Sequence, residues 1–463
     1  MRLPARPGER IDREREVSFT FGGEQVRAFE GDTIGSALYA SGQRVFSRSF
    51  KYHRPRGLLC CSGNCPNCMW RPRAELKDRY DVVIVGGGSH GLATAYYLQK
   101  EHGITDVAIL EKNYIGSGAA GRNTTIIRAN YRTPEGAEFY KESVRLYERL
   151  GADLDFNLLF SQQGHLTLAH SDRGIITANE RAEVNKLLGI DSRVIYPDEI
   201  RKLCPEMDLS DDVTWPVQAA LYHPPGGIIR HDAVVWGFAR GADRAGAEIH
   251  PYTEVTGIDR ANGRVTGVET NRGHIDCDTV VSCTAGWSTL VADLADVPLP
   301  ITTHILQAFV TEPVKPFLDV IIVSSQMHVY ISQTDRGEFL IGAEIEPYTT
   351  YKGIGTFPFL EYSARHALEL FPQLEQARIL RSWTGLCDLS PDYSPILGAT
   401  EVEGFLVSCG WGTYGFKAAP IVGTTLAEQI ATQQTPQLIA PFALERFYRD
   451  RLVSELAAAA VSH

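Results

Sequence analysis

The sequence contains no uninterrupted apolar run that approaches the length of a membrane-spanning helix. Its first six residues (MRLPAR) lack the apolar core of a secretory signal. An excess of positive charge is also absent, because 45 Lys and Arg residues face 56 Asp and Glu residues and the net charge is −11. This balance argues against general nucleic-acid binding. We therefore expect a cytoplasmic protein with no membrane span and no nucleic-acid partner.

The chain also lacks the cysteine pattern of a disulfide-bonded framework, since its nine cysteines are an odd number and no signal peptide precedes them. Four cysteines crowd into residues 60–68, which is typical of a ligand set. The other five are scattered and fit buried thiols. With 463 residues, 44% of them hydrophobic and 22% charged, the chain is long enough for two or three ordinary globular domains.

One segment carries every part of a dinucleotide-binding unit. An apolar strand runs into Gly86-x-Gly88-x-x-Gly91, a helical run follows, and a second apolar strand ends at Glu111. Gly86 permits a tight turn, and Gly88 lets backbone N–H groups approach a pyrophosphate. Gly91 lets the helix pack against the strand with its positive end toward the phosphates. Glu111 is placed to accept hydrogen bonds from ribose hydroxyls.

Short segments before this unit also have readable patterns. Residues 16–29 alternate apolar and polar side chains around a Gly-Gly pair, which predicts a β-hairpin. A short helix is expected at 33–40 with Asp32 as its N-cap. Residues 71–79 are charged and aperiodic, which indicates a linker. Later, residues 134–151 have the spacing of an amphipathic helix, and a final helix is expected at 423–431.

The blocks that follow the glycine motif resemble the β-subunit family of heterotetrameric sarcosine oxidases, which belong to the D-amino-acid-oxidase-like flavin-dependent amine oxidoreductases. The matching blocks are residues 81–98, 121–131 (GRNTTIIRANY), 160–170 (FSQQGHLTLAH), 227–238 (GIIRHDAVVWGF) and 410–417 (GWGTYGFK). The resemblance implies an α/β (overall α+β) fold, in which a Rossmann-like FAD-binding domain carries an inserted antiparallel-sheet substrate domain. It implies FAD-binding parts near 79–160, 225–300 and 385–463 and a substrate domain near 161–224 and 301–384.

The same resemblance implies oxidation of an amino acid by hydride transfer to FAD. Such a reaction needs cations that hold the substrate carboxylate against the flavin. Arg128 and Lys417 match the family's carboxylate-binding positions, and Tyr330, on an expected strand, matches a substrate-contacting tyrosine. A surface ion pair for Arg128 and a half-buried strand aromatic for Tyr330 are the structural alternatives. The expected cofactor-binding residues are Gly86, Gly88, Ser89, His90, Gly91, Glu111, Lys112, Gly118, Arg122, Asn123, Thr124, Thr125, Val255, Ala285, Gly286, Trp287, Gly410, Gly412, Thr413, Gly415, Phe416 and Lys417.

Two residues are candidates for covalent flavin attachment. His231 matches the histidine through which the family's β subunits attach FMN, a second flavin that would need a partner subunit. The alternative is that His231 and Asp232 open a helix at 233–240 with Asp232 as its cap. Cys387 lies near the position where monomeric sarcosine oxidases attach FAD, but the local pattern differs and favours a buried, inert thiol.

The N-terminal residues resemble a different protein class. Residues 9–68 are similar to the β-grasp, ferredoxin-like module of sarcosine oxidase α subunits and hydrogen cyanide synthase, and we assign 1–78 to this module and its linker. Three of the cysteines have the spacing of a plant-type 2Fe–2S site, but no cysteine between 69 and 203 supplies the fourth ligand. A completed cluster, a zinc site and a relic with free thiols remain alternatives, with the latter two favoured. The residues concerned are Cys60, Cys61, Cys65 and Cys68.

The expected activity is oxidation of sarcosine or a similar N-alkyl amino acid, with O2 or an electron-acceptor protein taking the electrons. The enzyme alternative is a glycine, proline or hydroxyproline oxidase or dehydrogenase, including a cyanide-forming glycine dehydrogenase. An alternative of another class is a flavin-binding electron-transfer subunit that is active only in a complex with partner subunits.

Overall fold

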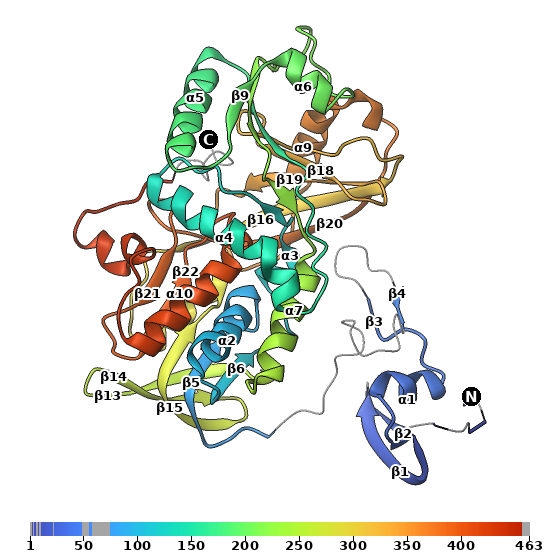
Figure 1. Cartoon of the computed structure of the whole chain (residues 1–463), viewed down its shortest axis with the longest axis vertical. Helices are drawn as coiled ribbons and strands as arrows, with labels where there is room; N and C mark the ends of the chain where they lie inside the picture. Colours follow the sequence, from blue (N-terminus) through green and yellow to red (C-terminus); the bar gives the residue numbers. More distant parts are fainter. Residues whose placement is uncertain are drawn as a thin grey trace. The chain divides into compact units, whose positions relative to one another are not determined.

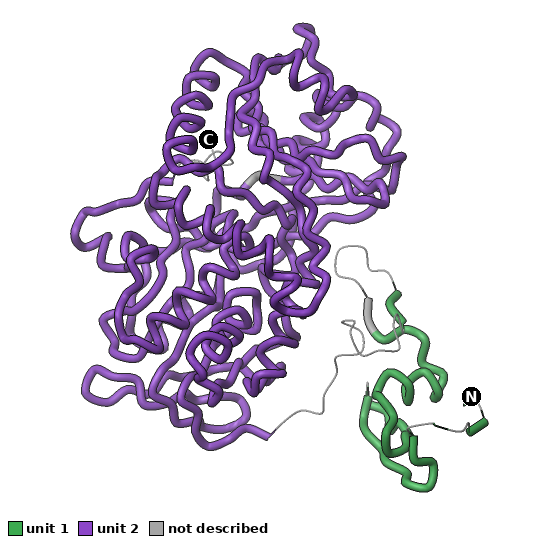
Figure 2. The backbone as a smooth tube through the Cα atoms, in the orientation of Figure 1, with its two compact units in different colours: residues 1–74 green, residues 75–463 purple. Residues whose placement is uncertain are grey.

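The computed structural model describes residues 2, 4–5, 8, 11–21, 23–48, 55–57 and 75–455. The chain forms two compact units, residues 1–74 and 75–463, shown in different colours in Figure 2. The predicted linker at 71–79 ends inside a strand, because Arg79 is the first residue of β5. The cysteine cluster at 60–68 lies outside the described residues.

In the first unit, the predicted hairpin at 16–29 is confirmed as an antiparallel pair followed by a helix. Alternation along the two strands leaves one face apolar, and this face packs on the helix in a small core. A second short pair follows. The elements are β1 (Asp12–Phe21), β2 (Glu24–Glu30), α1 (Ile34–Ala40), β3 (Ser47–Arg48) and β4 (Pro55–Arg56).

The N-cap of α1 is Thr33, so the expectation of Asp32 is wrong. The Thr33 side chain accepts a hydrogen bond from the Ser36 backbone N–H at 3.0 Å. The Asp32 carboxylate accepts instead from the Phe29 backbone N–H (3.0 Å) and the Ser36 hydroxyl (2.7 Å). Two adjacent residues could each cap a helix by composition, and the turn geometry selects between them.

The second unit contains two large sheets (Figure 1). In the first sheet the strand order is β12–β6–β5–β15–β14–β13, and β22 pairs with the far half of β15 and with β21. The strands β12, β6, β5, β15 and β22 are parallel. Their bounds are β5 (Arg79–Val85), β6 (Val107–Glu111), β12 (Glu248–Pro251), β13 (Val255–Ala261), β14 (Arg264–Thr270), β15 (Gly273–Ser282), β21 (Ile396–Ala399) and β22 (Phe405–Cys409).

Helices cover this sheet and bury it, which explains why its parallel strands are nearly continuous apolar runs. Figure 1 shows α2 between α10 and α7, and α2 contacts both. The predicted amphipathic helix at 134–151 is confirmed as α4. The final helix begins at Ala419 rather than at 423, because Pro420 suits a first turn that needs no N–H donor. The helices are α2 (Ser89–His102), α3 (Ala119–Arg122), α4 (Pro134–Asp153), α5 (Asp172–Leu187), α6 (Pro197–Leu203), α7 (His231–Arg244), α8 (Ser288–Asp293), α9 (Phe357–Leu370) and α10 (Ala419–Thr432).

The second sheet has the order β20–β16–β19–β18–β17–β8–β10–β9. Neighbouring strands are antiparallel except for the parallel pair β17 and β8, so the antiparallel expectation holds with one exception. The bounds are β8 (His165–Ala169), β9 (Arg193–Ile195), β10 (Ala219–His223), β16 (Thr302–Pro313), β17 (Ile321–Ser324), β18 (Val329–Gln333), β19 (Glu338–Ile345) and β20 (Ile379–Leu389).

The remaining elements are short. A two-stranded pair, β7 (Ile126–Ile127) with β11 (Gly227–Ile228), lies outside both sheets. Single 3-10 turns are η2 (Ala285–Trp287), η3 (Pro372–Leu374), η4 (Phe416–Ala418), η5 (Ala440–Phe442) and η6 (Leu444–Phe447). Within the described part of the chain, no helix has the length and apolar character needed to cross a membrane.

Candidate flavin and substrate site

The carboxyl ends of β5, β15 and β22 meet at one edge of the first sheet, where ligands bind in open α/β folds. The turn after β5 requires glycine at two positions. Gly86 has φ +112°, and a Cβ there would lie 2.5 Å from the Cys283 carbonyl oxygen. A Cβ on Gly91 would lie 2.1 Å from the Gly86 carbonyl oxygen, so α2 packs directly on the turn.

Gly88 is the N-cap of α2 and offers no side-chain cap. The first backbone N–H groups of α2, at Ser89 and after it, therefore suit an anionic ligand.

Glu111 lies at the end of β6 beside this turn. One carboxylate oxygen accepts from the Gly87 backbone N–H at 2.9 Å, and the other accepts from the Asn113 N–H at 2.8 Å. These bonds fix the carboxylate next to the glycine turn. The Ser117 hydroxyl also donates to the oxygen that Asn113 contacts, at 3.3 Å. A carboxylate oxygen has two lone pairs, so the oxygen that Gly87 contacts keeps capacity for a ribose hydroxyl.

The segment from Gly118 to Thr125 is held in shape by its own side chains. Gly118 is the N-cap of α3 and has no side-chain cap. The Asn123 side chain accepts from the Thr125 backbone N–H at 2.8 Å, and Thr125 has a left-handed φ of +69°. Arg122 donates to the Thr384 carbonyl at 3.3 Å and accepts at its own carbonyl from the Trp383 indole at 2.7 Å. Arg122 therefore fastens this loop to β20.

The loop after β15 also lies at the predicted site. Ala285 has φ +48°, and a Cβ on Gly286 would lie 2.5 Å from Leu386 Cβ, so this turn presses against β20. The Lys112 ammonium lies 3.6 Å from the centre of the Trp287 ring. Two of the expected cofactor-binding residues, from different loops, are therefore in contact. Val255 is buried at the start of β13.

The loop after β22 turns sharply before it reaches Lys417. Gly410 and Gly412 both have left-handed φ values, +70° and +53°. Thr413 and Phe416 are half-buried. A Cβ on Gly415 would lie 2.9 Å from Trp411 Cβ, so only glycine allows the loop to fold back on the tryptophan.

Arg128 lies close enough to Lys417 to influence the charge of the lysine side chain. Burial lowers the pKa of Lys417 well below its usual range, and the positive charge of Arg128 lowers the pKa further. Among the described residues, no carboxylate forms an ion pair with either of them. A guanidinium beside a lysine without an anion forms a strong site for a carboxylate ligand, because the ligand's charge stabilises the ammonium.

Each cation rests against a tyrosine ring. The Arg128 guanidinium lies 4.3 Å from the centre of the Tyr131 ring, and the Lys417 ammonium lies 5.7 Å from the centre of the Tyr414 ring. The Arg128 guanidinium also donates to the Asn130 side-chain oxygen at 2.9 Å.

Two buried residues beside Arg128 were missed by the sequence analysis. The Arg181 guanidinium donates to the Asn130 carbonyl at 2.5 Å, and one of its terminal nitrogens has no hydrogen-bonding partner among the described residues. Burial and the charge of Arg128 lower the pKa of Arg181 to about 9. Asn130 thus orients both guanidinium groups. Its place in the GRNTTIIRANY block was a usable signal, whereas Arg181 lies in a helix of ordinary charged composition.

A buried histidine pair lies on neighbouring strands of the second sheet. His165 and His223 face each other directly across β8 and β10. His223 accepts from the Ala129 backbone N–H at 3.2 Å, which connects the second sheet to the Arg128 segment. Both ring nitrogens of His165 lack a partner in the described part of the chain. Burial, with Arg128 as the next cause, lowers the pKa of His165 well below its usual value. The sequence analysis did not identify this pair.

The other predicted residues fall into three environments. Tyr330 lies on β18 as expected, with its hydroxyl buried near Thr124 but without a hydrogen bond of ordinary geometry among the described residues. Cys387 is buried on β20, and burial raises the pKa of its thiol. His231 is the half-buried first residue of α7. The expected helix start at 233 with an Asp232 cap is wrong, because Arg230 is the N-cap and Asp232 lies in the first turn, paired with Arg230 at 2.8 Å.

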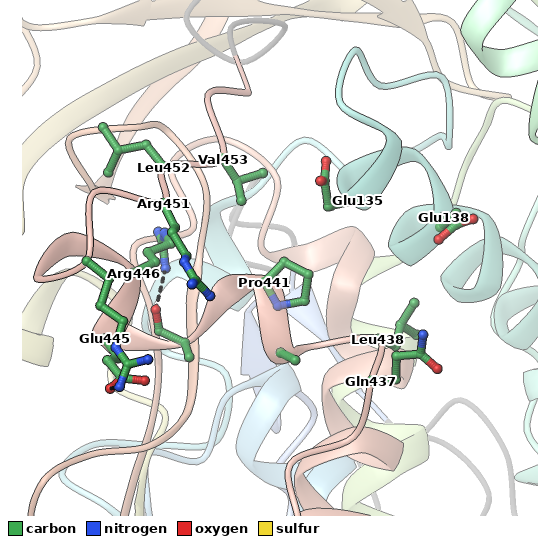
Figure 3. A pocket seen from close by; sticks show the side chains of 13 residues that line it. Glu135, Glu138, Gln437, Leu438, Pro441, Glu445, Arg446, Arg451, Leu452 and Val453 are labelled. Atoms are coloured by element: carbon green, nitrogen blue, oxygen red, sulfur yellow. Dashed lines mark hydrogen bonds and ion pairs between the residues drawn. The ribbon is translucent and has the colours of Figure 1, made fainter.

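A groove of about 950 Å3 lies elsewhere on the second unit. Figure 3 shows Glu135 and Glu138 of α4 on one side and Arg446 and Arg451 on the other. None of the predicted site residues lines it.

The residues at the sheet edge fit FAD in two ways. The uncapped N-terminus of α2 and the glycine turn suit a pyrophosphate, and the carboxylate of Glu111 suits a ribose. The second sheet closes over this edge through Arg122, Tyr330 and His223. A Rossmann-like nucleotide domain joined to a largely antiparallel sheet defines a flavin-dependent oxidoreductase.

Comparison with known proteins agrees with this class. The model of the family described as "FAD dependent oxidoreductase" matches residues 81–429, and the chain belongs to this family. The model described as "2Fe-2S iron-sulfur cluster binding domain" matches residues 14–77.

Similar proteins include two named "Sarcosine oxidase subunit beta". The Arthrobacter sp protein is 45% identical over 86% of this chain and 98% of its own length. The Rhizobium meliloti protein is 46% identical over 83% of this chain and 92% of its own length. A solved L-proline dehydrogenase from P. horikoshii has a TM-score of 0.77 and 30% identity, and the match covers 82% of this chain and 100% of that one.

Proposed function

We propose that the second unit oxidises sarcosine or a similar N-alkyl amino acid by hydride transfer from a substrate carbon to FAD. The observation that carries this proposal is the pair Arg128 and Lys417, two neighbouring basic side chains with no carboxylate partner among the described residues, where a bound carboxylate would stabilise the ammonium whose pKa burial and Arg128 lower. A guanidinium can hold a carboxylate with two hydrogen bonds, and a lysine adds a point charge. The names of the two 45–46% identical relatives support sarcosine as the substrate.

FAD, when bound, supplies the hydride acceptor. The chain's own residues position the substrate. Arg128 and Lys417 fix the carboxylate, which restricts the orientation of the adjacent carbon and nitrogen. Burial disfavours the Lys417 ammonium in the free enzyme, but once a carboxylate is bound the low-dielectric surroundings strengthen the attraction between the two charges. Tyr330, from the second sheet, supplies a buried hydroxyl near the FAD loop residue Thr124. The oxidised product is an imine, which hydrolyses to an amine and an aldehyde or oxo acid.

We further assign the substrate domain to residues 161–224 and 301–384, with the FAD-binding parts at 79–160, 225–300 and 385–463. The strands of the second sheet, which come from 165–223 and 302–389, support this division.

Anaerobic mixing with substrate tests the proposed activity. The holoenzyme is mixed with sarcosine without O2 and the flavin absorbance is followed. We expect rapid bleaching with sarcosine and slower bleaching with glycine. An unbleached flavin with sarcosine, in protein that dithionite does reduce, would refute oxidation of sarcosine by this chain.

Proline oxidation is the second candidate, supported by the L-proline dehydrogenase likeness at 30% identity. L-proline is also a secondary amino acid, so the same two cations could hold its carboxylate. Faster bleaching by L-proline than by sarcosine would favour this candidate. Glycine, hydroxyproline and cyanide formation from glycine are tested in the same assay.

An assembly with partner subunits is supported by the word "subunit" in the names of the two relatives. FMN at His231, which the family resemblance implies, would belong to such an assembly; the histidine is half-buried at the start of α7. Bleaching only after the partner subunits are added would support the complex-dependent alternative. Reoxidation of reduced enzyme by O2, followed optically, separates an oxidase from a dehydrogenase.

We propose that FAD is bound without a bond to Cys387. Burial raises the pKa of this thiol, which disfavours the thiolate needed as a nucleophile. Acid precipitation should release FAD into the supernatant. Flavin that stays on a peptide containing Cys387 would contradict the proposal, and flavin on a His231 peptide would identify the second site.

The cysteine cluster at residues 60–68 is supported as a 2Fe–2S site by the family model matched at 14–77. Zinc and free thiols remain the alternatives, because the fourth plant-type ligand is missing. Equal amounts of iron and acid-labile sulfide would select the cluster. Zinc without sulfide, or four titratable thiols without metal, would select one of the others.

A further inference from the structure

Three consecutive backbone carbonyls in the turn that carries Lys417 each accept a hydrogen bond from a side chain. The Gly415 carbonyl accepts from the His90 ring at 2.6 Å. The next carbonyl, of Phe416, accepts from the Tyr147 hydroxyl at 2.7 Å, and that of Lys417 accepts from the Ser143 hydroxyl at 2.6 Å. Tyr147 and Ser143 both come from α4, whereas His90 comes from α2. The backbone of this turn is therefore fixed by two helices.

The proton positions around His90 follow from its partners. A carbonyl can only accept, so Nε2 of His90 carries the proton that it donates to Gly415. Burial lowers the pKa of His90 to about 4, so the ring is neutral and Nδ1 accepts from the Ser408 hydroxyl at 3.0 Å. The Ser408 oxygen in turn accepts from the Trp411 indole N–H at 3.1 Å. Both ring nitrogens of His90 therefore have hydrogen-bonding partners. Nε2 contacts the Lys417 loop directly at Gly415, and Nδ1 contacts it at Trp411 through Ser408.

The backbone of His90 lies at the expected cofactor site. His90 is the second residue of α2, directly after the glycine turn, where the first N–H groups of the helix lack intrahelical acceptors. These N–H groups suit the FAD pyrophosphate, while the ring lies edge-on to Trp411 with centroids 4.8 Å apart. His90 was expected to be an FAD-binding residue, but its side chain contacts the Lys417 loop, at Gly415 and Trp411.

We propose that His90 is a positioning residue that couples FAD binding to substrate-carboxylate binding, by joining the pyrophosphate turn to the loop that carries Lys417. This proposal rests on the proposed function for the carboxylate site. A contact of this kind links two equilibria, so a carboxylate that orders the Lys417 loop must tighten FAD, and FAD must tighten the carboxylate by the same factor.

The test measures this coupling directly in the holoenzyme. Methoxyacetate is the probe, because it has the carboxylate of the proposed substrate but an ether oxygen in place of the amine. Its binding is followed by the change in the flavin spectrum, and FAD dissociation is measured by dialysis with and without saturating probe. In the wild type we expect the probe to tighten FAD by roughly fivefold or more, at the low end of measured couplings.

Matched variants separate coupling from folding. In His90→Gln the amide nitrogen can replace Nε2 as the donor to Gly415, so coupling should be largely retained. In His90→Asn and His90→Leu that donor is lost, and the factor should fall toward one. Tyr147→Phe removes the hydrogen bond to the next carbonyl from a helix that does not form the glycine turn. It should weaken probe binding but keep the coupling factor. Ser408→Ala removes the hydroxyl that donates to Nδ1 but leaves the bond from Nε2 to Gly415, so it should largely retain the coupling, as His90→Gln does. His90→Asn is the independent variant if His90→Leu fails to fold.

The outcomes distinguish the two levels of the argument. A wild type that binds FAD but shows no spectral response to methoxyacetate would overturn the carboxylate site, and the coupling with it. A protein that binds the probe and keeps the wild-type coupling factor in His90→Leu, or in His90→Asn, would overturn the role of His90 and leave the proposed function intact. Loss of coupling in His90→Leu with retention in His90→Gln supports the proposal.

Discussion

Tyr131 packs edge-on against Tyr414, with ring centroids 5.5 Å apart. One ring lies under the Arg128 guanidinium and the other under the Lys417 ammonium. Both rings are buried, so the aromatic pair forms a rigid spacer between two loops that are far apart in sequence. The positions of the two cations therefore depend on core packing, and no carboxylate among the described residues neutralises them.

Truncation of either cation should weaken transition-state binding. We expect Arg128→Ala and Lys417→Ala to raise KM and lower kcat together, by several kcal/mol in kcat/KM at most, because each removes a charged contact to the carboxylate. Arg145→Ala is the control: Arg145 lies on α4 with 60% of its side chain exposed and pairs with Glu142. Steady-state kinetics with sarcosine measure all three. Unchanged kcat/KM in either site variant would remove that residue from the site.

Carboxylate binding should depend on pH through Lys417. Its ammonium attracts the anion, so affinity for methoxyacetate should fall as pH rises through the lowered Lys417 pKa. Arg128 contributes to this lowering. Arg128→Gln should therefore weaken binding and also move the pH of this fall upward. Spectral titrations between pH 6 and 10 measure both effects, and an unmoved midpoint in Arg128→Gln would mean that the two charges do not interact.

The nucleotide half of the site was predictable because local rules determine it. A tight turn at Gly86 and a close helix at Gly91 require glycine whatever surrounds them, and the structure has both contacts. Apolar runs predicted the buried parallel strands, and the amphipathic period predicted α4. Cap positions were less predictable, because neighbouring residues such as Asp32 and Thr33 have the same capping chemistry.

The substrate half was less accessible to sequence reasoning. Asn130, Arg181 and the pair His165 and His223 depend on which strands and helices meet, and no local motif reports such contacts. His90 shows the same limit in another way: its place in the glycine motif suggested a cofactor contact, whereas tertiary packing directs its ring to Gly415. Sequence identifies the turn that holds a residue, and the packing decides what its side chain contacts.

His165 should be replaceable by an apolar residue without loss of stability. Both of its ring nitrogens are buried without partners among the described residues, and such groups cost about 1–3 kcal/mol. We expect His165→Leu to raise the free energy of unfolding. His223→Leu, directly across the strand pair, should lower it by about 1–3 kcal/mol, since it leaves the Ala129 N–H unpaired. Urea denaturation at pH 8 distinguishes the two, and equal destabilisation would contradict the argument.

His165 should also make the fold less stable in acid. The pKa of His165 is lowered in the folded state, so below the ordinary histidine pKa of about 6.5 the unfolded chain binds protons that the folded chain does not. Stability should therefore fall as pH falls through 6.5. The fall should be smaller in His165→Leu, which removes one such site. Parallel slopes between pH 7 and 5 for wild type and variant would show that His165 is already protonated in the fold.

The buried carboxylate of Asp388, beside the Gly410–Gly412 turn, should make stability depend on pH in the opposite direction. Asp388 accepts from the Gly410 backbone N–H at 2.6 Å, and its own carbonyl accepts from Gly412 at 2.8 Å. No cation pairs with it among the described residues, and burial raises its pKa to about 6. Between pH 3.8, the ordinary pKa of an aspartate, and about pH 6, the folded state binds a proton at Asp388 that the unfolded chain does not bind. The free energy of unfolding therefore falls as pH rises through this range. Above pH 6 the buried charge costs about 3 kcal/mol.

Asp388→Asn keeps an oxygen for the Gly410 N–H and removes the charge. We expect it to raise the free energy of unfolding at pH 8 by up to about 3 kcal/mol, with an advantage that shrinks toward zero near pH 4. Asp388→Leu is the control, because it leaves the Gly410 N–H without an acceptor and should destabilise by about 1–3 kcal/mol at both pH values. Urea midpoints at pH 8 and near pH 4 measure these differences. A lower free energy of unfolding for Asp388→Asn at pH 8 would contradict this argument. It would mean that the charge of Asp388 stabilises the Gly410–Gly412 turn.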